Sequence, residues 1–283
     1  MNPTSDQAAL NSVPCVSTRA PWQAVIFPRG GGKTLFEWTC HFFWGLNEAL
    51  NTFVGPWNSL ETNKKVGMLF AQNADGETWG NKDYGLPVPT KAAGHDVTVP
   101  GYFQPRTSDY SAQIAAFNDA GVDIIGGITD VDDFKAFVNQ CSQQGFKPKA
   151  MTVAAALLFP SGIGALGELG DGISSEVWWT PAFPFKSTLT GETSRDIADA
   201  WEKETNRQWT QPLGYSHAIR EVALGILKRS TNPLDRKANR DSMKATNLTT
   251  LIGPVNFSTG PPPKRVHDAD LWRPVGQGHQ VQV

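Results

Sequence analysis

The sequence predicts an α/β protein built on parallel sheets flanked by helices. Four short apolar runs of strand character follow one another along the chain, at residues 65–71, 96–100, 122–128 and 149–154. A stretch of helical character follows each run, and such an alternation is typical of a parallel sheet with helices on both faces. Small ligands bind such sheets at the carboxyl ends of the strands. We therefore expect function in the turns that follow these runs.

Composition narrows the function classes. The chain has 283 residues, of which 40% are hydrophobic and 18% charged, enough for one large or two ordinary domains with a real core. A net charge of −2 and a pI near 6.2 argue against nucleic-acid binding. The sequence has no apolar run of about 18 residues, as a membrane-spanning helix requires. Its first residues do not resemble a secretion signal.

The segment before the first of these runs is expected to hold one strand and one long helix. The strand covers residues 13–17, and the helix covers residues 35–60, where aromatic and aliphatic side chains recur at roughly helical spacing. A polar connection at residues 61–64 then leads into the alternating part of the chain.

Two helices of the alternating part have readable ends. A helix over residues 110–120 ends at Gly121, because glycine adopts the left-handed conformation that closes a helix. The next helix is expected to begin after Thr129, with Asp130, Asp132 and Asp133 in its first turn. Three carboxylates in a row could hold a metal, but their charge also complements the helix N-terminus, and we favour that explanation.

The rest of the chain changes character after residue 184. Before that point we expect a short helix at residues 160–169 and a final strand at residues 175–180. Beyond it, helices are expected at residues 192–205, 213–228 and 234–245, followed by a short strand at residues 250–257. A tail rich in proline and glycine begins at residue 260.

One motif suggests nucleotide binding. The segment Gly30–Thr34 reads Gly-Gly-Gly-Lys-Thr, which is the end of a phosphate-binding loop. A full loop needs a glycine where this chain has Phe27, and Phe27 with Pro28 does not favour close approach of the backbone to phosphate. We therefore favour a flexible glycine turn. A nucleotide-binding enzyme that uses Lys33 and Thr34 stays the alternative from another function class.

Other catalytic signatures are weak. The sequence Gly-Tyr-Ser-His-Ala around Ser216 resembles half of a nucleophile elbow but has no strand before it. The histidines do not have the spacing of a zinc pair, and the three cysteines form neither a metal motif nor a disulfide framework; they are His41, His95, His217, His267, His279, Cys15, Cys40 and Cys141. One cysteine pair could form, and the sequence leaves open which. The pattern favours a binding protein over an enzyme.

Several segments of the chain are informative as an ordered set. The first is Ser-Asp-Gln-Ala-Ala-Leu-Asn-Ser-Val-Pro-Cys-Val-Ser-Thr at residues 5–18, and the others are residues 20–22, 36–45, 64–70, 111–117, 120–124, 144–149 and 214–215. In order and spacing they resemble the type I periplasmic solute-binding proteins of branched-chain amino acid-type ABC transporters. Residues 5–18 resemble the end of that family's first lobe, and the later segments fit the helix that follows, the second lobe and the return. The resemblance covers about residues 2–257.

The resemblance implies a clamp of two lobes that closes on a small solute by hinge motion. The solute, amino acid-like or an aromatic acid or amide, is then delivered to an ABC transporter permease in the inner membrane. It implies a periplasmic monomer with no cofactor, no metal and no nucleic-acid partner, and no chemistry of its own. A clamp-type sensor domain is a further alternative.

The family pattern also predicts the domain organisation. Residues 1–62 form a partial first lobe, residues 63–182 the second lobe, residues 183–250 a helical return to the first lobe, and residues 251–283 the last crossover and tail. Members of the family have several more strand–helix units before the equivalent of residues 13–17. We therefore expect the first lobe to be incomplete and the chain to be truncated at its N-terminus; the alternative is a partner chain that supplies the missing strands.

The ligand-binding residues are implied by position in the family pattern. The first lobe would contribute Ser17, Thr18 and Trp22; the second lobe would contribute Asp75, Trp79, Trp179 and Thr180. The three tryptophans suggest an aromatic wall, because an indole ring combines a large apolar face with one hydrogen-bond donor. Packing beneath the turns is the alternative for each ring.

Overall fold

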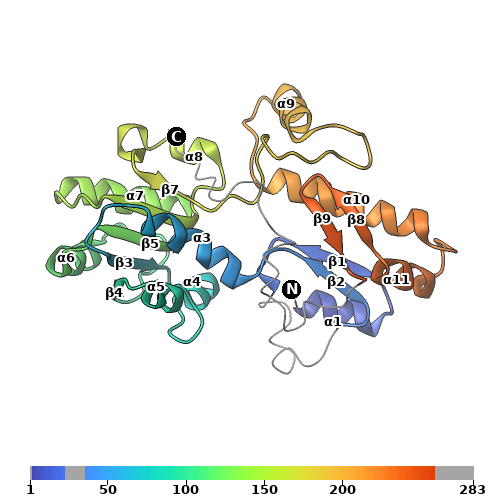
Figure 1. Cartoon of the computed structure of the whole chain (residues 1–283), viewed down its shortest axis with the longest axis horizontal. Coiled ribbons are helices and arrows are strands. Elements are labelled where there is room, and N and C mark those ends of the chain that lie inside the picture. The colour runs from blue at the N-terminus through green and yellow to red at the C-terminus, as the bar shows by residue number, and fades with distance from the viewer. Residues whose placement is uncertain (1, 23–35, 259–283) are drawn as a thin grey trace. The chain divides into compact units, whose positions relative to one another are not determined.

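The computed structural model describes residues 2–22 and 36–258, and the contacts between residues divide the chain into two compact units (Figure 1). Unit 2 is the contiguous stretch Asn47–Val177. Unit 1 comprises the described residues on either side of it, 2–22, 36–46 and 178–258. Whether these units are the lobes of a clamp, with the boundaries predicted above, stays a proposal.

Unit 2 is built on a five-stranded sheet in which all pairs are parallel. In spatial order the strands are β4 (Asp96–Thr98), β3 (Lys65–Phe70), β5 (Ile124–Thr129), β6 (Ala150–Ala155) and β7 (Ile173–Ser174). The α/β class and the four strands of the alternating part are confirmed. The final strand expected at residues 175–180 does not form. The last strand of the sheet is β7, which is shorter and lies earlier in the chain.

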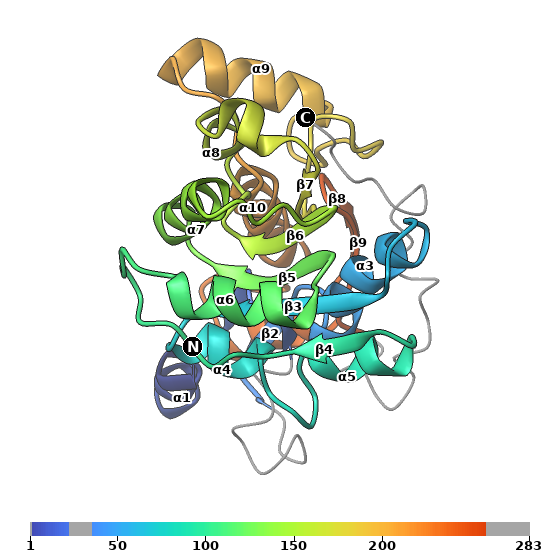
Figure 2. The same ribbon diagram turned by 90° about the vertical axis from the view of Figure 1, so that its left-hand side faces the viewer.

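Helices cover both faces of this sheet; they are α3 (Leu46–Asn58), α4 (Ala74–Trp79), α5 (Pro87–Ala92), α6 (Ser111–Ala120), α7 (Val131–Gln143), α8 (Pro160–Gly164) and the 3₁₀ helix η2 (Gly167–Gly170). In Figure 2, α6 lies in front of β3 and β5. Its buried Ile114 and Phe117 join Ile125 of β5 in one apolar cluster. On the other face, Trp57 of α3 lies so close to Gly126 that a Cβ there would be 2.5 Å from the ring.

The ends of α6 and α7 follow from single residues. Gly121 closes α6 with a φ of 65°, which costs glycine little. The cap of α7 is Asp130 rather than the expected Thr129, because the Asp130 carboxylate accepts from the N–H of Asp133. Asp132 and Asp133 occupy the first turn, as the helix explanation predicts. Within residues 2–22 and 36–258, no cluster of three His, Cys, Asp or Glu side chains is placed to hold a metal ion.

Unit 1 contains a parallel strand pair and an antiparallel hairpin. The pair is β1 (Cys15–Thr18) with β2 (Thr39–Phe42), and the hairpin is β8 (Asn247–Thr250) with β9 (Gly253–Asn256). The helices are α1 (Asn2–Leu10), α9 (Ser194–Thr205), α10 (Pro212–Arg229) and α11 (Arg236–Lys244). Aromatic side chains dominate the core. Phe42, the last residue of β2, and Phe43, which follows it, both pack against Tyr215 of α10.

One sequence expectation for this part of the chain is wrong, and one helix was missed. The long helix expected at residues 35–60 is replaced by β2 and the shorter α3, because pairing with β1 draws residues 39–42 into a strand. The strand expected at residues 250–257 does form, as β9, and it pairs with β8 in a hairpin. Helix α1 was not expected at all.

The open question of cysteine pairing is settled by strand register. Cys15 is opposite Thr39, and Cys40 is opposite Val16. Neighbouring positions along a strand point to opposite faces, so the two thiols lie on opposite faces of the pair. All three cysteines, including the buried Cys141, are free thiols. In the described part of the chain, no helix is both long and apolar enough to cross a membrane.

Candidate functional site

The carboxyl end of β1 in unit 1 brings together several polar side chains. Ser17 lies opposite His41 of β2, and its Oγ is 2.9 Å from the imidazole Nδ1. The other ring nitrogen of His41, Nε2, is 2.8 Å from the carbonyl oxygen of Ala20. The hydroxyl of Thr18 donates to the carbonyl oxygen of Phe42 on the neighbouring strand. Ser17, Thr18 and His41 are all partly exposed.

These contacts fix the direction of each hydrogen bond. A carbonyl oxygen only accepts, so Nε2 of His41 carries a hydrogen. Burial is the main cause that lowers the pKa of His41, which favours the neutral ring at physiological pH. The Nδ1 atom of a neutral ring with hydrogen on Nε2 is an acceptor, so the Ser17 hydroxyl donates to it.

Arg19, directly after β1, extends this cluster. Its backbone has a φ of 69°, a left-handed conformation that costs a non-glycine residue about 1 kcal/mol and is found often at ligand sites. The side chain is exposed, and its Nη1 is 3.4 Å from Ser216 Oγ near the start of α10. A second guanidinium, that of Arg220, donates to the backbone oxygen of Ser216. The arrangement places two guanidinium groups beside Ser216, near the start of α10.

Sequence reasoning missed Arg19 and His41 as site residues. Both lie beside residues that the resemblance did name, but their roles depend on structure: a left-handed φ in one case and strand register in the other. The only sequence signal for Arg19 was its place within the segment Ser17–Trp22, which the resemblance assigns to ligand binding. Ser216 was weighed as a nucleophile and rejected, and in the structure it lies within α10, with no strand before it.

The other predicted residues of unit 1 have different environments. Trp22 is half-buried, and its backbone N–H donates to the carbonyl oxygen of Trp44 at 3.4 Å. Thr180 is also half-buried, and its Oγ1 accepts from the N–H of Ala182 at 3.0 Å. Both keep some surface that a ligand can reach.

Trp179 lies in the core of unit 1. Its side chain is 0% exposed, its Nε1 donates to Ser194 Oγ at 3.2 Å, and its ring stands edge-on to that of Trp209. Gly214 of α10 lies against the indole so closely that a Cβ there would be 2.2 Å from it. These contacts support the packing alternative for this ring.

Asp75 and Trp79 belong to α4 of unit 2, which follows the carboxyl end of β3. The Asn73 side chain caps this helix by accepting from the Gly76 N–H at 2.9 Å. Asp75 is exposed in the first turn. The Trp79 ring is only 7% exposed and packs edge-on against Phe53 of α3. As a ligand contact, Asp75 is therefore accessible, whereas Trp79 is placed as the packing alternative predicts.

A carboxylate missed by sequence reasoning lies at the same edge of the unit 2 sheet. Glu176 follows β7 and is 5% exposed. Its Oε1 accepts from the N–H of Ala155 at 3.3 Å and its Oε2 from the Ser175 hydroxyl at 3.1 Å. Ala155, the last residue of β6, has a φ of 63°. Strained strand ends thus occur in both units, at Arg19 and at Ala155.

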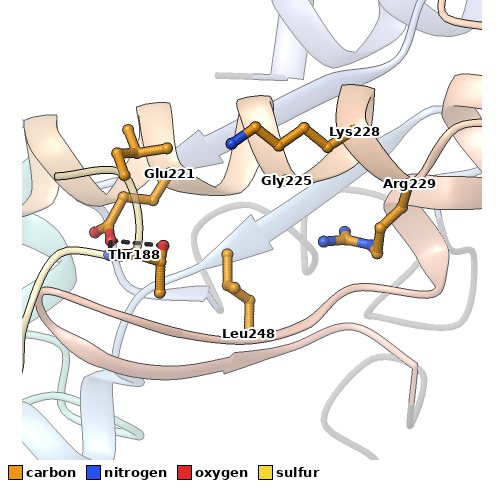
Figure 3. A pocket seen from close by; sticks show the side chains of 7 residues that line it. Thr188, Glu221, Gly225, Lys228, Arg229 and Leu248 are labelled. Carbon is orange, nitrogen blue, oxygen red and sulfur yellow. Dashed lines mark hydrogen bonds between the residues drawn. The ribbon is translucent and has the colours of Figure 1, made fainter. Parts of the chain in front are cut away.

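A small cavity of about 220 Å³ lies elsewhere in unit 1, between α10, β8 and the segment before α9 (Figure 3). It is lined by Thr188, Leu189, Glu221, Gly225, Lys228, Arg229 and Leu248. The Glu221 carboxylate is already used, because it accepts from the N–H and hydroxyl of Thr188 and from the N–H of Leu251. Its lining residue nearest to Ser216 along α10 is Glu221, five residues or about 7.5 Å away, and no residue of β1 or β2 lines it.

The glycine-rich motif Gly30–Thr34 lies outside the described residues.

Comparisons with known proteins agree with this architecture. The sequence profile of the periplasmic binding protein family matches residues 2–269. Curated proteins yield no match to the sequence. A solved leucine-binding protein from Thermotoga maritima matches with a TM-score of 0.72 at 15% identity, over 89% of this chain and 67% of its own.

Two further solved structures are similar. A solute-binding protein of an ABC transporter from R. palustris, in complex with benzoate, matches with a TM-score of 0.68 at 14% identity, over 89% of this chain and 66% of its own. A fatty acid ABC transporter substrate-binding protein from Thermomonospora curvata matches with a TM-score of 0.66 at 13% identity, over 90% and 63%. At such identities the likeness shows the fold. The chain spans about two thirds of the length of these proteins. Because the family profile covers nearly all of the sequence, the chain belongs to the periplasmic binding protein family.

Proposed function

We propose that the protein captures a small solute in the periplasm and delivers it to the permease of an ABC transporter in the inner membrane, acting as a monomer. Membership of the periplasmic binding protein family supports solute capture and a periplasmic location. The solved neighbours that are named as ABC transporter binding proteins support transport as its purpose.

The observation that carries this proposal is the polar cluster at the carboxyl end of β1. Ser17 and Thr18 carry hydroxyl groups there, and the next residue, Arg19, is exposed, with its Nη1 3.4 Å from Ser216 Oγ. The ends of parallel strands are where α/β proteins bind small ligands, and a guanidinium holds a carboxylate by two parallel hydrogen bonds. Trp22, Thr180 and Asp75 are proposed as further contacts because they remain accessible.

The chemistry of this cluster favours a small organic acid with an apolar body. Leucine, benzoate and a fatty acid, the compounds in the names of the solved neighbours, all carry a carboxyl group on an apolar frame. We propose an amino acid-like solute, or an aromatic acid or amide. If the solute carries a carboxylate, that carboxylate pairs with Arg19.

Thermal unfolding of the full chain tests the proposal. The probes are L-leucine, benzoate, octanoate and Mg-ATP, each at millimolar concentration. We expect one of the organic acids to raise the melting temperature, since a ligand at 100 times its Kd stabilises the folded state by about 2.7 kcal/mol. Arg19→Ala should remove the shift.

Arg195→Ala is the matched control, because Arg195 is an exposed arginine on α9 that forms a surface pair with Asp199 at 4.0 Å. Equal shifts in the two variants would take Arg19 out of the site. A shift with Mg-ATP alone, lost in Lys33→Ala, would replace solute capture by nucleotide binding. If none of the organic acids shifts the melting temperature, the proposed solute class is wrong.

A further inference from the structure

The cavity between α10, β8 and the segment before α9 is lined by residues that the proposed function does not use (Figure 3). Its volume of about 220 Å³ is far more than the roughly 15 Å³ that one water needs, yet below the roughly 300–1,000 Å³ of sites for drug-sized ligands. It therefore has room for one small molecule.

One wall of this cavity is fixed by polar contacts to α10. The backbone N–H and the hydroxyl of Thr188 both donate to Oε1 of Glu221, whose Oε2 accepts from the N–H of Leu251. The hydroxyl of Ser187 lies 2.7 Å from Nε2 of His217, about one turn before Glu221 on the same helix. Because two consecutive loop residues are tied to α10, the hollow is formed in advance, and a ligand does not have to order the loop when it binds.

The opposite wall carries positive charge. Lys228 and Arg229, the last two residues of α10, are exposed, and Figure 3 shows their side chains extending back along the helix toward Gly225. The guanidinium of Arg229 is held at one side, because its Nη2 donates to Thr246 Oγ1 at 2.8 Å. Within the described residues, neither cation forms an ion pair with a carboxylate. Their remaining N–H groups are therefore available to a ligand.

Gly225 makes room between the two walls. Glycine is unfavourable in the interior of a helix, so its presence there calls for a reason. A Cβ at position 225 would lie 2.9 Å from Nη1 of Arg229 and 3.3 Å from the Leu248 side chain of β8. The missing side chain lets the guanidinium lie against the helix, and it leaves Leu248 and Leu189 as apolar parts of the lining.

A simpler account explains the charge alone. Basic side chains stabilise the last turn of a helix, because they lie near its unpaired carbonyl groups, and Lys203 in the last turn of α9 is such a residue. That effect requires neither a cavity nor a glycine inside the helix, and α10 has both. Lys203 therefore serves as the matched control for Lys228.

We propose that this cavity binds a small organic monoanion, such as a short-chain carboxylate, at a site separate from the solute site proposed above. Lys228 and Arg229 bring two positive charges to the lining and Glu221 brings one negative charge, so one ligand charge neutralises it. The carboxylate accepts from the two cations, as charge-assisted hydrogen bonds favour. The apolar body of the ligand lies against Leu248 and Leu189. The inference depends neither on Arg19 nor on delivery to a permease.

Methyl NMR of the full chain with ¹³C-labelled leucine reads this site directly. The signals of Leu189 and Leu248 are assigned with Leu189→Met and Leu248→Met, and pentanoate is added to millimolar concentration at constant ionic strength. We expect both signals to shift and to saturate, while those of Leu69, buried in the core of unit 2, stay unchanged. Pentanamide has the same apolar body without the charge and should bind at least about fivefold more weakly.

Two variants test the features that define the site. Lys228→Gln removes a charge, and Gly225→Ala displaces the guanidinium of Arg229. Each should weaken pentanoate binding by about fivefold or more. Lys203→Gln removes the matching charge from the end of α9 and should leave pentanoate binding unchanged. Lys228 and Lys203 are both exposed, so neither glutamine variant is expected to disturb folding.

Three results would overturn the inference and leave the proposed function standing. They are the absence of a saturable shift at Leu189 and Leu248, equal affinity for pentanamide and pentanoate, and the same loss of binding in Lys203→Gln as in Lys228→Gln. A shift at both leucines that vanishes in Arg19→Ala would also overturn it, because the carboxylate would then act from the proposed solute site. Loss of the thermal shift described above, with the leucine shifts retained, would instead count against the proposed function alone.

Discussion

The contact between Gly214 of α10 and the buried Trp179 ring gives a sharp test of the unit 1 core. A Cβ at position 214 would lie 2.2 Å from Cγ, 2.3 Å from Cδ1 and 2.5 Å from Cδ2 of the indole. Contacts this short do not occur in folded proteins, so Gly214→Ala must displace either the ring or the helix. The ring has little room, because it is fully buried and tied to Ser194.

The expected cost is the difference between two effects. Forcing an extra methyl group into a packed core costs up to about 3 kcal/mol. Alanine in place of glycine inside a helix returns about 1 kcal/mol. The net loss is therefore up to about 2 kcal/mol, which at roughly 2–4 °C per kcal/mol lowers the melting temperature by up to about 4–8 °C.

Differential scanning calorimetry of the full chain measures this effect. Gly225→Ala in the same helix is the control, because its Cβ would meet mainly the flexible end of Arg229 at 2.9 Å and Leu248 at 3.3 Å. We expect Gly225→Ala to be neutral or slightly stabilising. A Gly214→Ala protein that melts at or above the wild-type temperature would refute the packing assigned to Trp179.

Three further predictions concern other buried groups. Trp57→Phe should cost about 1–2 kcal/mol in urea unfolding, because the Thr152 hydroxyl loses the indole N–H that donates to it at 2.9 Å; an unchanged midpoint would contradict this. Burial is the main cause that raises the pKa of Asp133, so its ionised form destabilises the fold. That penalty is absent below the ordinary value of 3.8 and grows as pH rises through the raised pKa. Asp133→Asn should therefore gain stability relative to wild type as pH rises, and parallel pH curves would refute this. Burial raises the pKa of Cys40 to about 11 and that of Cys141 to about 12, so iodoacetamide at about pH 8 should label both slowly until urea unfolds the chain; rapid labelling of the folded protein would contradict their burial.

The central strands of unit 2 were predictable because burial on both faces leaves a mark in the sequence. Strands β3 and β5 are buried along nearly their whole length and read as continuous apolar runs. Strand β2 left no such mark. It is four residues long, only its ends are buried, and it is held by pairing with β1 and by aromatic contacts to α10. Its neighbours have helical spacing, so the local pattern favoured a helix that tertiary contacts overrule.

The candidate site was predictable only in part for a related reason. Ser17 and Thr18 are named by the family resemblance, and the structure places them at a strand end with polar neighbours. The direction of the Ser17 hydrogen bond depends on the register that sets His41 opposite it, which no local pattern encodes. Trp179 could not be separated from a ligand contact by residue type, because buried and ligand-facing indoles look alike in a sequence.

The division of the chain into one contiguous and one discontinuous unit bears on its synthesis. All the strands of the unit 2 sheet have left the ribosome once residue 177 is out, so this sheet can close while translation continues. The short pair β1–β2 is made earlier but has to wait for α10, more than 150 residues later, before its aromatic face is covered. Until then Phe42 and Phe43 stand open to water, and the nascent chain is most exposed to aggregation and most in need of a chaperone in that interval.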